Sequence, residues 1–225
     1  MKKFLLILLA VAMMLTFVAC GEGSDADKTD PTNDPATTNA PEETDKEFEL
    51  GEVTGLKWEN AFIGLGCTIP EGWAFSTQEE LSVLNNVAGD YVADEYQDLV
   101  KNSAYFYDMH AKPSADTSSV SALLEKASQA TINATNIELT YEQSAKIIKE
   151  SYEQMGPTTF AHEIVDITIS GNKYPTLKIA ANISGMDFYQ YTLMVKCTGY
   201  IATINITAST PELLESLAAS FYEVR

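Results

Sequence analysis

The chain has 225 residues, of which 14 are Lys or Arg and 32 are Asp or Glu, which gives a net charge of -18. A chain this acidic does not offer the basic face that a nucleic-acid binder needs, and charge does not attract it to anionic lipid surfaces. Two histidines and three cysteines argue against a His-rich zinc site and a disulfide framework. The length favours one or two domains, and 45% hydrophobic residues are enough for a core.

The first twenty residues have the features of an export signal. Two lysines precede a run over residues 4–19 that is apolar except for Thr16, and the run ends immediately before Cys20. A basic start, an apolar centre and a small residue before the cleavage point predict a signal peptide over residues 1–19. The alternatives are an uncleaved N-terminal anchor and a soluble secreted protein.

The end of this run, Phe17-Val18-Ala19-Cys20, resembles the lipobox of bacterial lipoproteins, with Phe17 where the family usually has Leu. The resemblance implies that the Cys20 thiol takes a diacylglyceryl group and that cleavage makes Cys20 the new N-terminus. Burial of the acyl CH₂ groups, at about 0.8 kcal/mol each, then holds the protein on the membrane. We therefore expect a lipid-anchored protein on the extracellular side of a Gram-positive-type cell membrane.

Residues 20–47 read as an acidic tether. After its first residue the segment contains nine acidic residues and two lysines, and no aromatic or large aliphatic side chain, so it cannot bury enough apolar area to become ordered. Asp25, Asp27 and Asp30 suggest calcium, but Asp30 occupies the loop position where an EF-hand needs Gly. The sequence therefore predicts a disordered spacer followed by a single domain over residues 48–225.

The first half of the domain mixes short strands with helices. Alternation and turn residues predict strands over 58–62 and 65–69, separated from the next element by a turn at 70–73. Thr77 and Glu80 form a capping box, which predicts that a helix begins there. Apolar residues at helical spacing predict further helices at 91–101, 120–127 and 141–155, the last with Thr140 as its N-cap, and strands are expected over 104–111 and 132–139.

The second half of the domain reads as four consecutive strands joined by hairpin turns. The strands lie at 161–169, 174–183, 187–197 and 200–207, and the turns fall at Gly171-Asn172, Ser184-Gly185 and Thr198-Gly199. Alternation along each strand predicts an antiparallel meander with one buried face and one polar face. Thr210 and Pro211 then begin a last helix. We therefore expect an α+β fold in which helices cover an antiparallel sheet.

The order of these parts resembles the PsbP-like α-β-α sandwich, and in particular its bacterial lipoprotein versions. The resemblance rests on the run Trp58-Glu59-Asn60-Ala61-Phe62-Ile63-Gly64-Leu65, on Pro70-Glu71-Gly72-Trp73, and on the later hairpins and final helix. It covers most of residues 56–225. It implies the sandwich fold and favours binding or scaffolding over catalysis.

Candidate catalytic and metal-binding residues are few. Asp108 and His110 lie two apart on one expected strand face and can form a hydrogen-bonded pair, but no serine nucleophile stands in a recognisable motif. His162 lies near Glu163 and Asp166, a set with metal-ligating chemistry. The simpler interpretation of both sets is ordinary pairs of side chains, so we expect neither an enzyme nor a cofactor.

Cys67 and Cys197 are the two cysteines of the domain, and both fall at inward positions of expected strands. In an exported protein they could form a disulfide. The alternative is two buried thiols that act as small apolar residues. Both interpretations stay open because the sequence does not show which strands are adjacent.

Two functions are compatible with these features. The first is a non-enzymatic surface lipoprotein that binds or positions another protein of the cell envelope. The second is a small-ligand or carbohydrate-binding module that serves a transporter, with its ligand in a cleft between the sheet and the helices at 77–101. Neither requires nucleic acid, and both require attachment to the membrane through Cys20.

Overall fold

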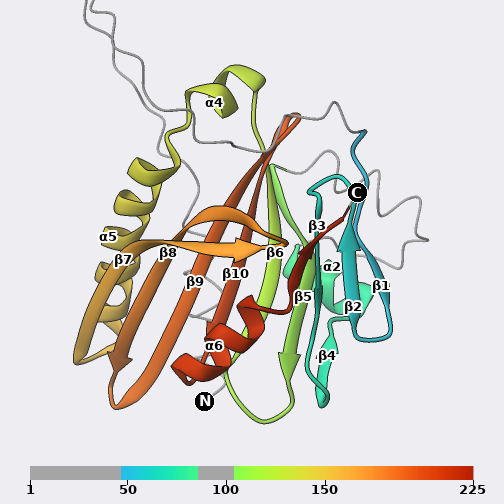
Figure 1. Cartoon of the computed structure of the whole chain (residues 1–225). Helices are drawn as coiled ribbons and strands as arrows, with labels where there is room; N and C mark the ends of the chain where they lie inside the picture. The colour runs from blue at the N-terminus through green and yellow to red at the C-terminus, as the bar shows by residue number, and fades with distance from the viewer. Residues whose placement is uncertain (1–46, 86–103, 225) are drawn as a thin grey trace, which may run out of the picture.

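The structure, a computed structural model, describes residues 47–85 and 104–224. These residues form two antiparallel sheets with helices packed against the larger one, which confirms the expected α+β class (Figure 1). The signal peptide, Cys20, the tether up to residue 46 and the expected helix over 91–101 lie outside the described residues.

The larger sheet has seven strands in the order β4-β5-β6-β10-β9-β8-β7. Their bounds are β4 Trp73–Phe75, β5 Tyr105–Pro113, β6 Ser119–Lys126, β7 Thr158–Ile169, β8 Asn172–Ile183, β9 Met186–Cys197 and β10 Tyr200–Ala208. The smaller sheet, in the order β1-β2-β3-β11, consists of β1 Glu52–Thr54, β2 Lys57–Asn60, β3 Leu65–Thr68 and β11 Phe221–Glu223. The helices of the described residues are α2 Gln78–Leu84, α4 Gln129–Ala134, α5 Ile137–Met155 and α6 Pro211–Ala218.

The larger sheet is covered on both faces, and each face has its own apolar cluster. On the face turned toward the viewer in Figure 1, the smaller sheet and α6 pack against it through a cluster that includes Trp58, Ile204 and Leu214. On the opposite face α5 lies over β7 and β8, where Ile148 and Ile179 belong to a second cluster. Full burial of such side chains stabilises the fold by about 1.5–3 kcal/mol each.

β10 lies at the centre of this arrangement, and all nine of its residues are buried. Its even-numbered residues belong to the front cluster, so Thr203, Asn205 and Thr207 point to the opposite face. These three polar residues are only 6–7% exposed. The expectation of one buried and one polar, open face is therefore wrong at the centre of the sheet, where the polar face is buried as well.

Leu177 and Leu193 also occupy opposite faces, although the alternation suggested one common inward face. β8 and β9 pair so that Leu177 lies opposite Thr192, and residues that lie opposite in an antiparallel pair point to the same side. Leu177 therefore belongs to the cluster under α5 and Leu193 to the front cluster. Alternation divides the side chains of one strand into two sets, one for each face of the sheet. The pairing register then decides which set of the neighbouring strand lies on the same face as each of them.

Two expected elements have the wrong type. The segment 120–127, expected as a helix, lies almost entirely in β6, whose residues from Val120 to Leu124 are all buried. A strand buried on both faces has a continuous apolar run, which periodicity does not distinguish from a buried helix. The segment 132–139, expected as a strand, contains the end of α4 and the start of α5, whose N-cap is Asn136 instead of Thr140.

The four hairpin strands and their turns are confirmed, with one turn displaced by a residue. The β7–β8 turn is Ser170-Gly171 instead of Gly171-Asn172, and the β8–β9 turn is Ser184-Gly185. In both turns the two central residues have positive φ, 49° and 91° in the first and 52° and 89° in the second. Such two-residue turns match the twist of the flanking strands, which explains the unbroken β7–β8 register.

Local capping residues set several helix ends. The capping box of Thr77 and Glu80 at the start of α2 is confirmed, as is the start of α6 at Thr210 and Pro211. At its other end α6 stops at Ala218, and the residues after it form β11. The starts of α2 and α6 were predictable because each depends on contacts within one turn, whereas the start of α5 was predicted one turn too late.

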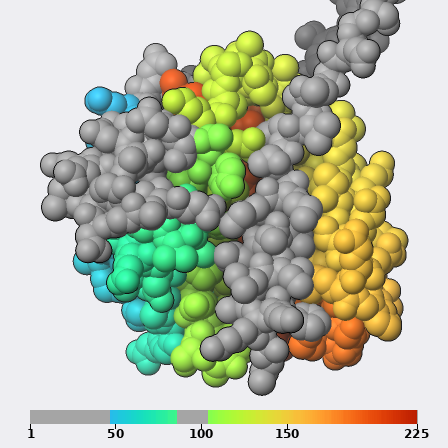
Figure 2. All heavy atoms as spheres, turned by 180° about the vertical axis from the view of Figure 1, so that it is seen from behind, coloured from blue at the N-terminus to red at the C-terminus, as the bar shows by residue number. Residues whose placement is uncertain are grey.

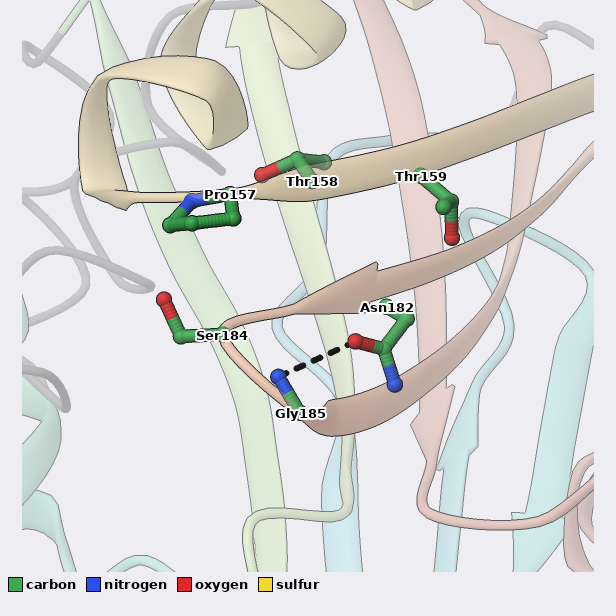
Figure 3. A pocket seen from close by; sticks show the side chains of 6 residues that line it. All are labelled: Pro157, Thr158, Thr159, Asn182, Ser184 and Gly185. Atoms are coloured by element: carbon green, nitrogen blue, oxygen red, sulfur yellow. Dashed lines mark hydrogen bonds between the residues drawn. The ribbon is translucent and has the colours of Figure 1, made fainter.

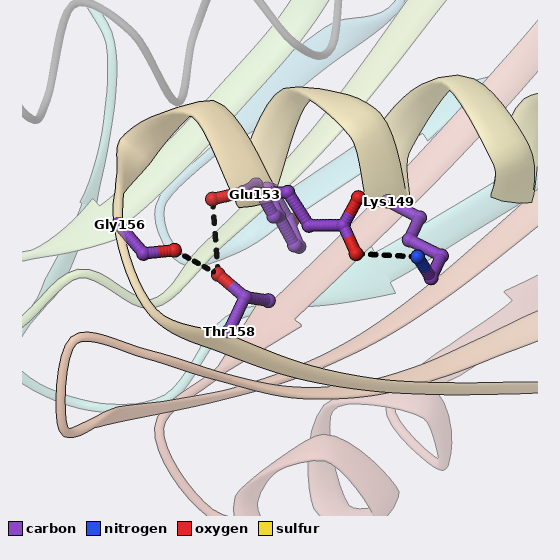
Figure 4. A network of polar contacts seen from close by, with 5 residues as sticks. Lys149, Glu153, Gly156 and Thr158 are labelled. Carbon is purple, nitrogen blue, oxygen red and sulfur yellow. Dashed lines mark hydrogen bonds and ion pairs between the residues drawn. The ribbon is translucent and has the colours of Figure 1, made fainter.

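The C-terminal end of α5 is closed by the residue that begins β7. The Thr158 hydroxyl is a donor to two carbonyl oxygens, that of Tyr152 at 3.0 Å and that of Gly156 at 2.8 Å (Figure 4). Separately, Lys149 and Glu153 form an ion pair on the exposed side of the same helix, where such pairs contribute about 0.3–0.5 kcal/mol. The single hydroxyl hydrogen of Thr158 is thus shared between a carbonyl of the last turn of α5 and the carbonyl of its C-cap residue.

Tyr141 connects α5 to the sheet at a proline. Pro175 of β8 has no N–H to donate toward β9, and the β8–β9 register ends at its neighbour Thr176. The Tyr141 hydroxyl donates to the Pro175 carbonyl at 3.0 Å and accepts from the Met194 N–H at 2.8 Å. A side-chain hydroxyl thus bridges the two strands where the ladder is interrupted, and α5 is held in place over it.

We expect Tyr141→Phe to lower the free energy of unfolding by about 1–3 kcal/mol, because the buried Met194 N–H and Pro175 carbonyl lose their partner. Urea denaturation measures the change. Tyr152→Phe is the matched control, since Tyr152 is buried in the same cluster but its hydroxyl makes no hydrogen bond within the described residues. Equal losses in the two variants would contradict the bridging role of Tyr141.

Candidate functional site

A β-bulge in β5 separates the two residues that the sequence suggested as a pair. The β5–β6 register shifts between Tyr107 and Met109, which leaves Asp108 as the extra residue. Asp108 contacts residues of the smaller sheet, whereas His110 lies opposite Ser121 on the other face and contacts Ser76. The expected Asp108–His110 pair is therefore not formed. Such bulges re-aim individual side chains, and here the bulge places a carboxylate inside the protein.

Asp108 is 8% exposed and accepts hydrogen bonds from three donors. The Gly51 N–H lies 2.9 and 3.1 Å from its two oxygens, Trp58 Nε1 lies 3.1 Å from Oδ2, and Asn60 Nδ2 lies 2.9 Å from Oδ2. Burial raises the pKa of the Asp108 carboxyl, and the three hydrogen bonds oppose that rise. The carboxylate therefore fastens the start of the domain to the centre of β5.

The segment before Gly51 is held by aromatic contacts of Phe48. Phe48 stacks on Tyr200 at a centroid distance of 5.0 Å and meets Phe62 edge-on at 5.4 Å. A Cβ at Gly51 would lie 2.1 Å from Trp58 Nε1, so only glycine lets the backbone approach this close. The chain thus enters the domain at a defined and strongly held point, which no periodic pattern in residues 48–57 predicts.

His110 and Ser76 form a pair that resembles part of a catalytic arrangement. Ser76 Oγ lies 3.0 Å from His110 Nδ1. Burial and the neighbouring Lys112 lower the pKa of His110 from 6.5 to about 4, against an opposing effect of Glu80. Activation of a serine also requires a group that orients the imidazole, and Glu80 instead accepts the Thr77 N–H at 2.9 Å. The pair is therefore best described as a neutral, partly buried hydrogen bond.

We expect acidification from pH 7 to pH 5 to destabilise the fold through His110. Its pKa is lower in the folded state than in the unfolded chain, so its contribution is present above pH 6.5 and is lost as the pH falls toward about 4. The free energy of unfolding, measured by urea denaturation across this range, should decrease in the wild type and change much less in His110→Gln.

His162→Gln is the matched control for this measurement, because the chain has two histidines and the other is exposed. It should retain the wild-type pH dependence. A His110→Gln protein with an undiminished loss of stability between pH 7 and pH 5 would show that other groups titrate there.

The second candidate set does not assemble either. His162 Nε2 contacts Glu142 of α5 at 3.2 Å, while Glu163 and Asp166 pair with Lys178 and Lys173 of β8 at 3.0 and 3.4 Å. The three residues therefore bind three different partners instead of converging. Within residues 47–85 and 104–224, no group of three metal-ligating side chains is close enough to hold an ion.

Cys67 and Cys197 are separate buried thiols, so the disulfide interpretation is replaced by its alternative. Both belong to the front cluster, but Cys67 lies on β3 of the smaller sheet and Cys197 ends β9 of the larger one. Burial raises the pKa of the Cys67 thiol to about 12. A protonated, buried thiol behaves as a small apolar residue.

Among the described strands, β7 is the longest that lies at the edge of a sheet. This strand has twelve residues, and among residues 47–85 and 104–224 it pairs on one side only, with β8. Within the described residues the other outer strands, β1, β4 and β11, have three residues each. β7 contains no Pro or Lys and no register irregularity, which are common devices that block such an edge, and its charged residues are Glu163 and Asp166. The sequence predicted the strand but not its position at the edge.

A shallow hollow of about 530 Å³ lies at the beginning of β7 (Figure 3). It is lined by Pro157, Thr158, Thr159, Asn182, Ser184 and Gly185. The Gly185 N–H donates to Asn182 Oδ1 at 3.0 Å, which holds the β8–β9 turn at one side of the hollow. The lining is small and uncharged, and it is continuous with the free edge of β7.

Comparisons with known proteins give structural similarities only. No family model matches the chain, and no curated protein matches it. A crystal structure from Bacteroides thetaiotaomicron is similar over 77% of this chain, with 8% identity and a TM-score of 0.39, and the chain spans 50% of that protein. A Pseudomonas aeruginosa protein of unknown function is similar over 50% of this chain and 71% of its own, with 16% identity and a TM-score of 0.28.

The helices of the described residues are all too short or too polar to cross a membrane. The Bacteroides and Pseudomonas similarities assign no activity, ligand or partner. Function therefore has to be argued from the residues of this chain.

Proposed function

We propose that this chain is a lipid-anchored, non-enzymatic module of the cell surface that docks an extended segment of another envelope protein along β7. The observation that carries this proposal is the length and openness of the β7 edge. An extended peptide that adds to such an edge gains a series of main-chain hydrogen bonds, and its alternate side chains supply specificity.

The backbone groups available at this edge follow from the β7–β8 pairing. Hydrogen-bonded and non-hydrogen-bonded residue pairs alternate in an antiparallel ladder. The Ser184 N–H donates to the Pro157 carbonyl at 2.8 Å, so residues 157 and 184 form a hydrogen-bonded pair. From this pair onward, every second pair of the β7–β8 register is hydrogen-bonded. The odd-numbered residues of β7 are therefore bonded to β8, and the N–H and C=O groups of the even-numbered residues point outward.

The surroundings of the edge favour a basic partner. Glu142, Glu163 and Asp166 are exposed carboxylates on or beside β7. Exposed ion pairs like those that these carboxylates make contribute only about 0–1 kcal/mol, so they exchange readily for new ones. Together with the net charge of -18, this favours an extended segment that carries Lys or Arg. The hollow at the start of β7 can accept one small side chain of that segment.

The remaining support comes from the sequence. The lipobox-like end at Cys20 and the acidic tether place a folded module at a distance from the membrane, and the PsbP-like resemblance favours binding or assembly over catalysis. The attachment of Gly51 to Asp108 suits a tethered module, because tension along the tether is transferred to β5 of the larger sheet.

We expect His162→Pro to abolish most docking, because it removes an outward N–H at the centre of the edge and leaves the ladder to β8 intact. The measurement is cross-linking of the lipidated protein on intact cells of its source, followed by mass spectrometry. The wild type should capture one dominant envelope protein, and His162→Pro should reduce that capture at least tenfold.

His162→Ala is the matched control, since it removes the same side chain but keeps the backbone N–H. It should capture the partner as the wild type does. Equal capture by the proline and alanine variants, or diffuse capture with no enriched protein, would contradict docking at β7.

We expect Cys20→Ser to release the protein from the membrane fraction, because the acyl chains on this thiol are the proposed anchor. Cell fractionation and the intact mass of the purified protein measure anchoring and lipidation together. Cys67→Ala changes a buried cysteine of the domain and should stay in the membrane fraction. Membrane retention of Cys20→Ser would mean that an uncleaved N-terminal anchor holds the protein.

A further inference from the structure

The outer edge of β7 has two flanks, because successive side chains of a strand point to opposite faces of the sheet. Phe160 and Ile164 pack against the cluster under α5, so the even-numbered residues form the α5 flank. Val165 and Ile167 pack against the front cluster, so the odd-numbered residues form the front flank. Figures 1 and 2 show α5 and β7 together at one margin of the molecule. A strand added along β7 would place its side chains alternately beside these two flanks.

These four apolar side chains of β7 are each half-buried. Within residues 47–85 and 104–224, the strand has β8 on one side and no strand on the other. An added strand would cover the apolar surface that is still exposed, and its removal from water favours binding in proportion to the area covered. We therefore expect apolar residues of the partner to face positions 160, 164, 165 and 167.

The charged side chains of the two flanks lie at other positions along the edge. Glu163 on the front flank and Asp166 on the α5 flank each pair with a lysine of β8. His162 on the α5 flank contacts Glu142 of the neighbouring helix at 3.2 Å. The three carboxylate side chains are still 49–59% exposed. Opposite charges that face each other across an antiparallel pair attract, so we expect Lys or Arg to face positions 162, 163 and 166.

An antiparallel partner suits this edge better than a parallel one. All strand pairs within residues 47–85 and 104–224 are antiparallel, and antiparallel pairing is slightly more stable per residue. The even-numbered residues of β7 would form the hydrogen-bonded pairs, so Glu163 would belong to a non-hydrogen-bonded pair, in which side chains lie closer. The C-terminal end of the partner segment would lie beside the hollow lined by Thr159 and Asn182, which has space for a small residue (Figure 3).

We infer that the partner segment runs antiparallel to β7 and carries the pattern apolar-basic-apolar-apolar-basic-basic-any-apolar-small, whose residues face positions 167 to 159 in turn. The inference rests on the docking proposed for β7 and specifies the chemistry of its partner. A slip of one residue would place basic side chains opposite Ile164 and Ile167, or opposite Ala161 and Val165. The pattern therefore sets the register of the added strand as well as its affinity.

The test uses the full chain, purified in detergent, and a fluorescent peptide with the sequence Val-Lys-Val-Ile-Lys-Lys-Thr-Val-Ser. Fluorescence anisotropy measures the affinity of this peptide for the wild type, for His162→Pro and for His162→Ala. The wild type and His162→Ala should bind it with similar affinity. His162→Pro should bind it at least tenfold more weakly, because the proline removes an outward N–H of the edge.

A charge reversal tests the residue that faces Glu163. Glu163→Lys should bind this peptide at least fivefold more weakly, because attraction becomes repulsion, and it should prefer a second peptide with Glu in place of the first residue of the Lys-Lys pair. The wild type should prefer the original peptide at least fivefold, which keeps the test decisive if Glu163→Lys is unstable. Glu71→Lys, in the exposed turn before β4, changes the net charge equally and should keep the wild-type preference.

Disulfide formation determines the direction of the bound peptide. A peptide with Cys in place of its first Val should link to Ile167→Cys at least fivefold faster than to Thr159→Cys in a glutathione buffer. The two positions lie toward opposite ends of β7, and both belong to non-hydrogen-bonded pairs, whose closer side chains suit a disulfide. Cys67 and Cys197 are buried, so they do not compete.

Three results would overturn the inference. The first is the absence of peptide binding to the wild type, and the second is an unchanged peptide preference in Glu163→Lys. The third is faster linkage to Thr159→Cys, which would mean a parallel strand. Each of them leaves docking at β7 in place if His162→Pro still captures less of the cellular partner than His162→Ala does. Equal peptide binding by the wild type and His162→Pro would instead contradict docking at the edge itself.

Discussion

The larger sheet has to bury both faces of β10, and much of the remaining structure follows from this constraint. The front set of β10 side chains is apolar and is covered by the smaller sheet and α6. The opposite set contains Thr203, Asn205 and Thr207, for which an apolar cover would leave buried polar groups unsatisfied at about 1–3 kcal/mol each. The long helix α5 accordingly lies to one side, over β7 and β8, where Leu177 and Ile179 supply an apolar surface.

Side chains replace backbone hydrogen bonds at the two places where the sheet is irregular. At Pro175 the Tyr141 hydroxyl bridges β8 and β9. At the bulge in β5, Asp108 accepts hydrogen bonds from the Gly51 N–H and from two side-chain donors. Both devices join segments that are far apart in the chain, and both use a buried polar group that is well satisfied. They contrast with Asn205 and Tyr107, each of which has a buried polar atom without a hydrogen-bond partner within the described residues.

Local patterns predicted the parts of the fold that depend on a few neighbouring residues. The capping box at Thr77, the start of α6 and the four hairpin strands were accessible because caps and two-residue turns are decided within one turn of chain. The element β6 was misread because burial on both faces removes its alternation. The pairing of Asp108 with Gly51 was not predictable, since it depends on a bulge that joins residues 57 positions apart.

The sequence by itself determined the α+β class with its antiparallel meander, and it is the sole basis for the predicted export signal, the lipobox-like Cys20 and the acidic tether. It also determined the alternation of apolar and polar residues along β10, because that pattern depends only on which residues are consecutive in the sequence. Only the tertiary structure decided that the polar side of β10 is buried, that β7 forms a long free edge and that Cys67 and Cys197 remain separate. The physical reason is that alternation reports the two sides of one strand, whereas register, layer order and burial depend on contacts between distant segments.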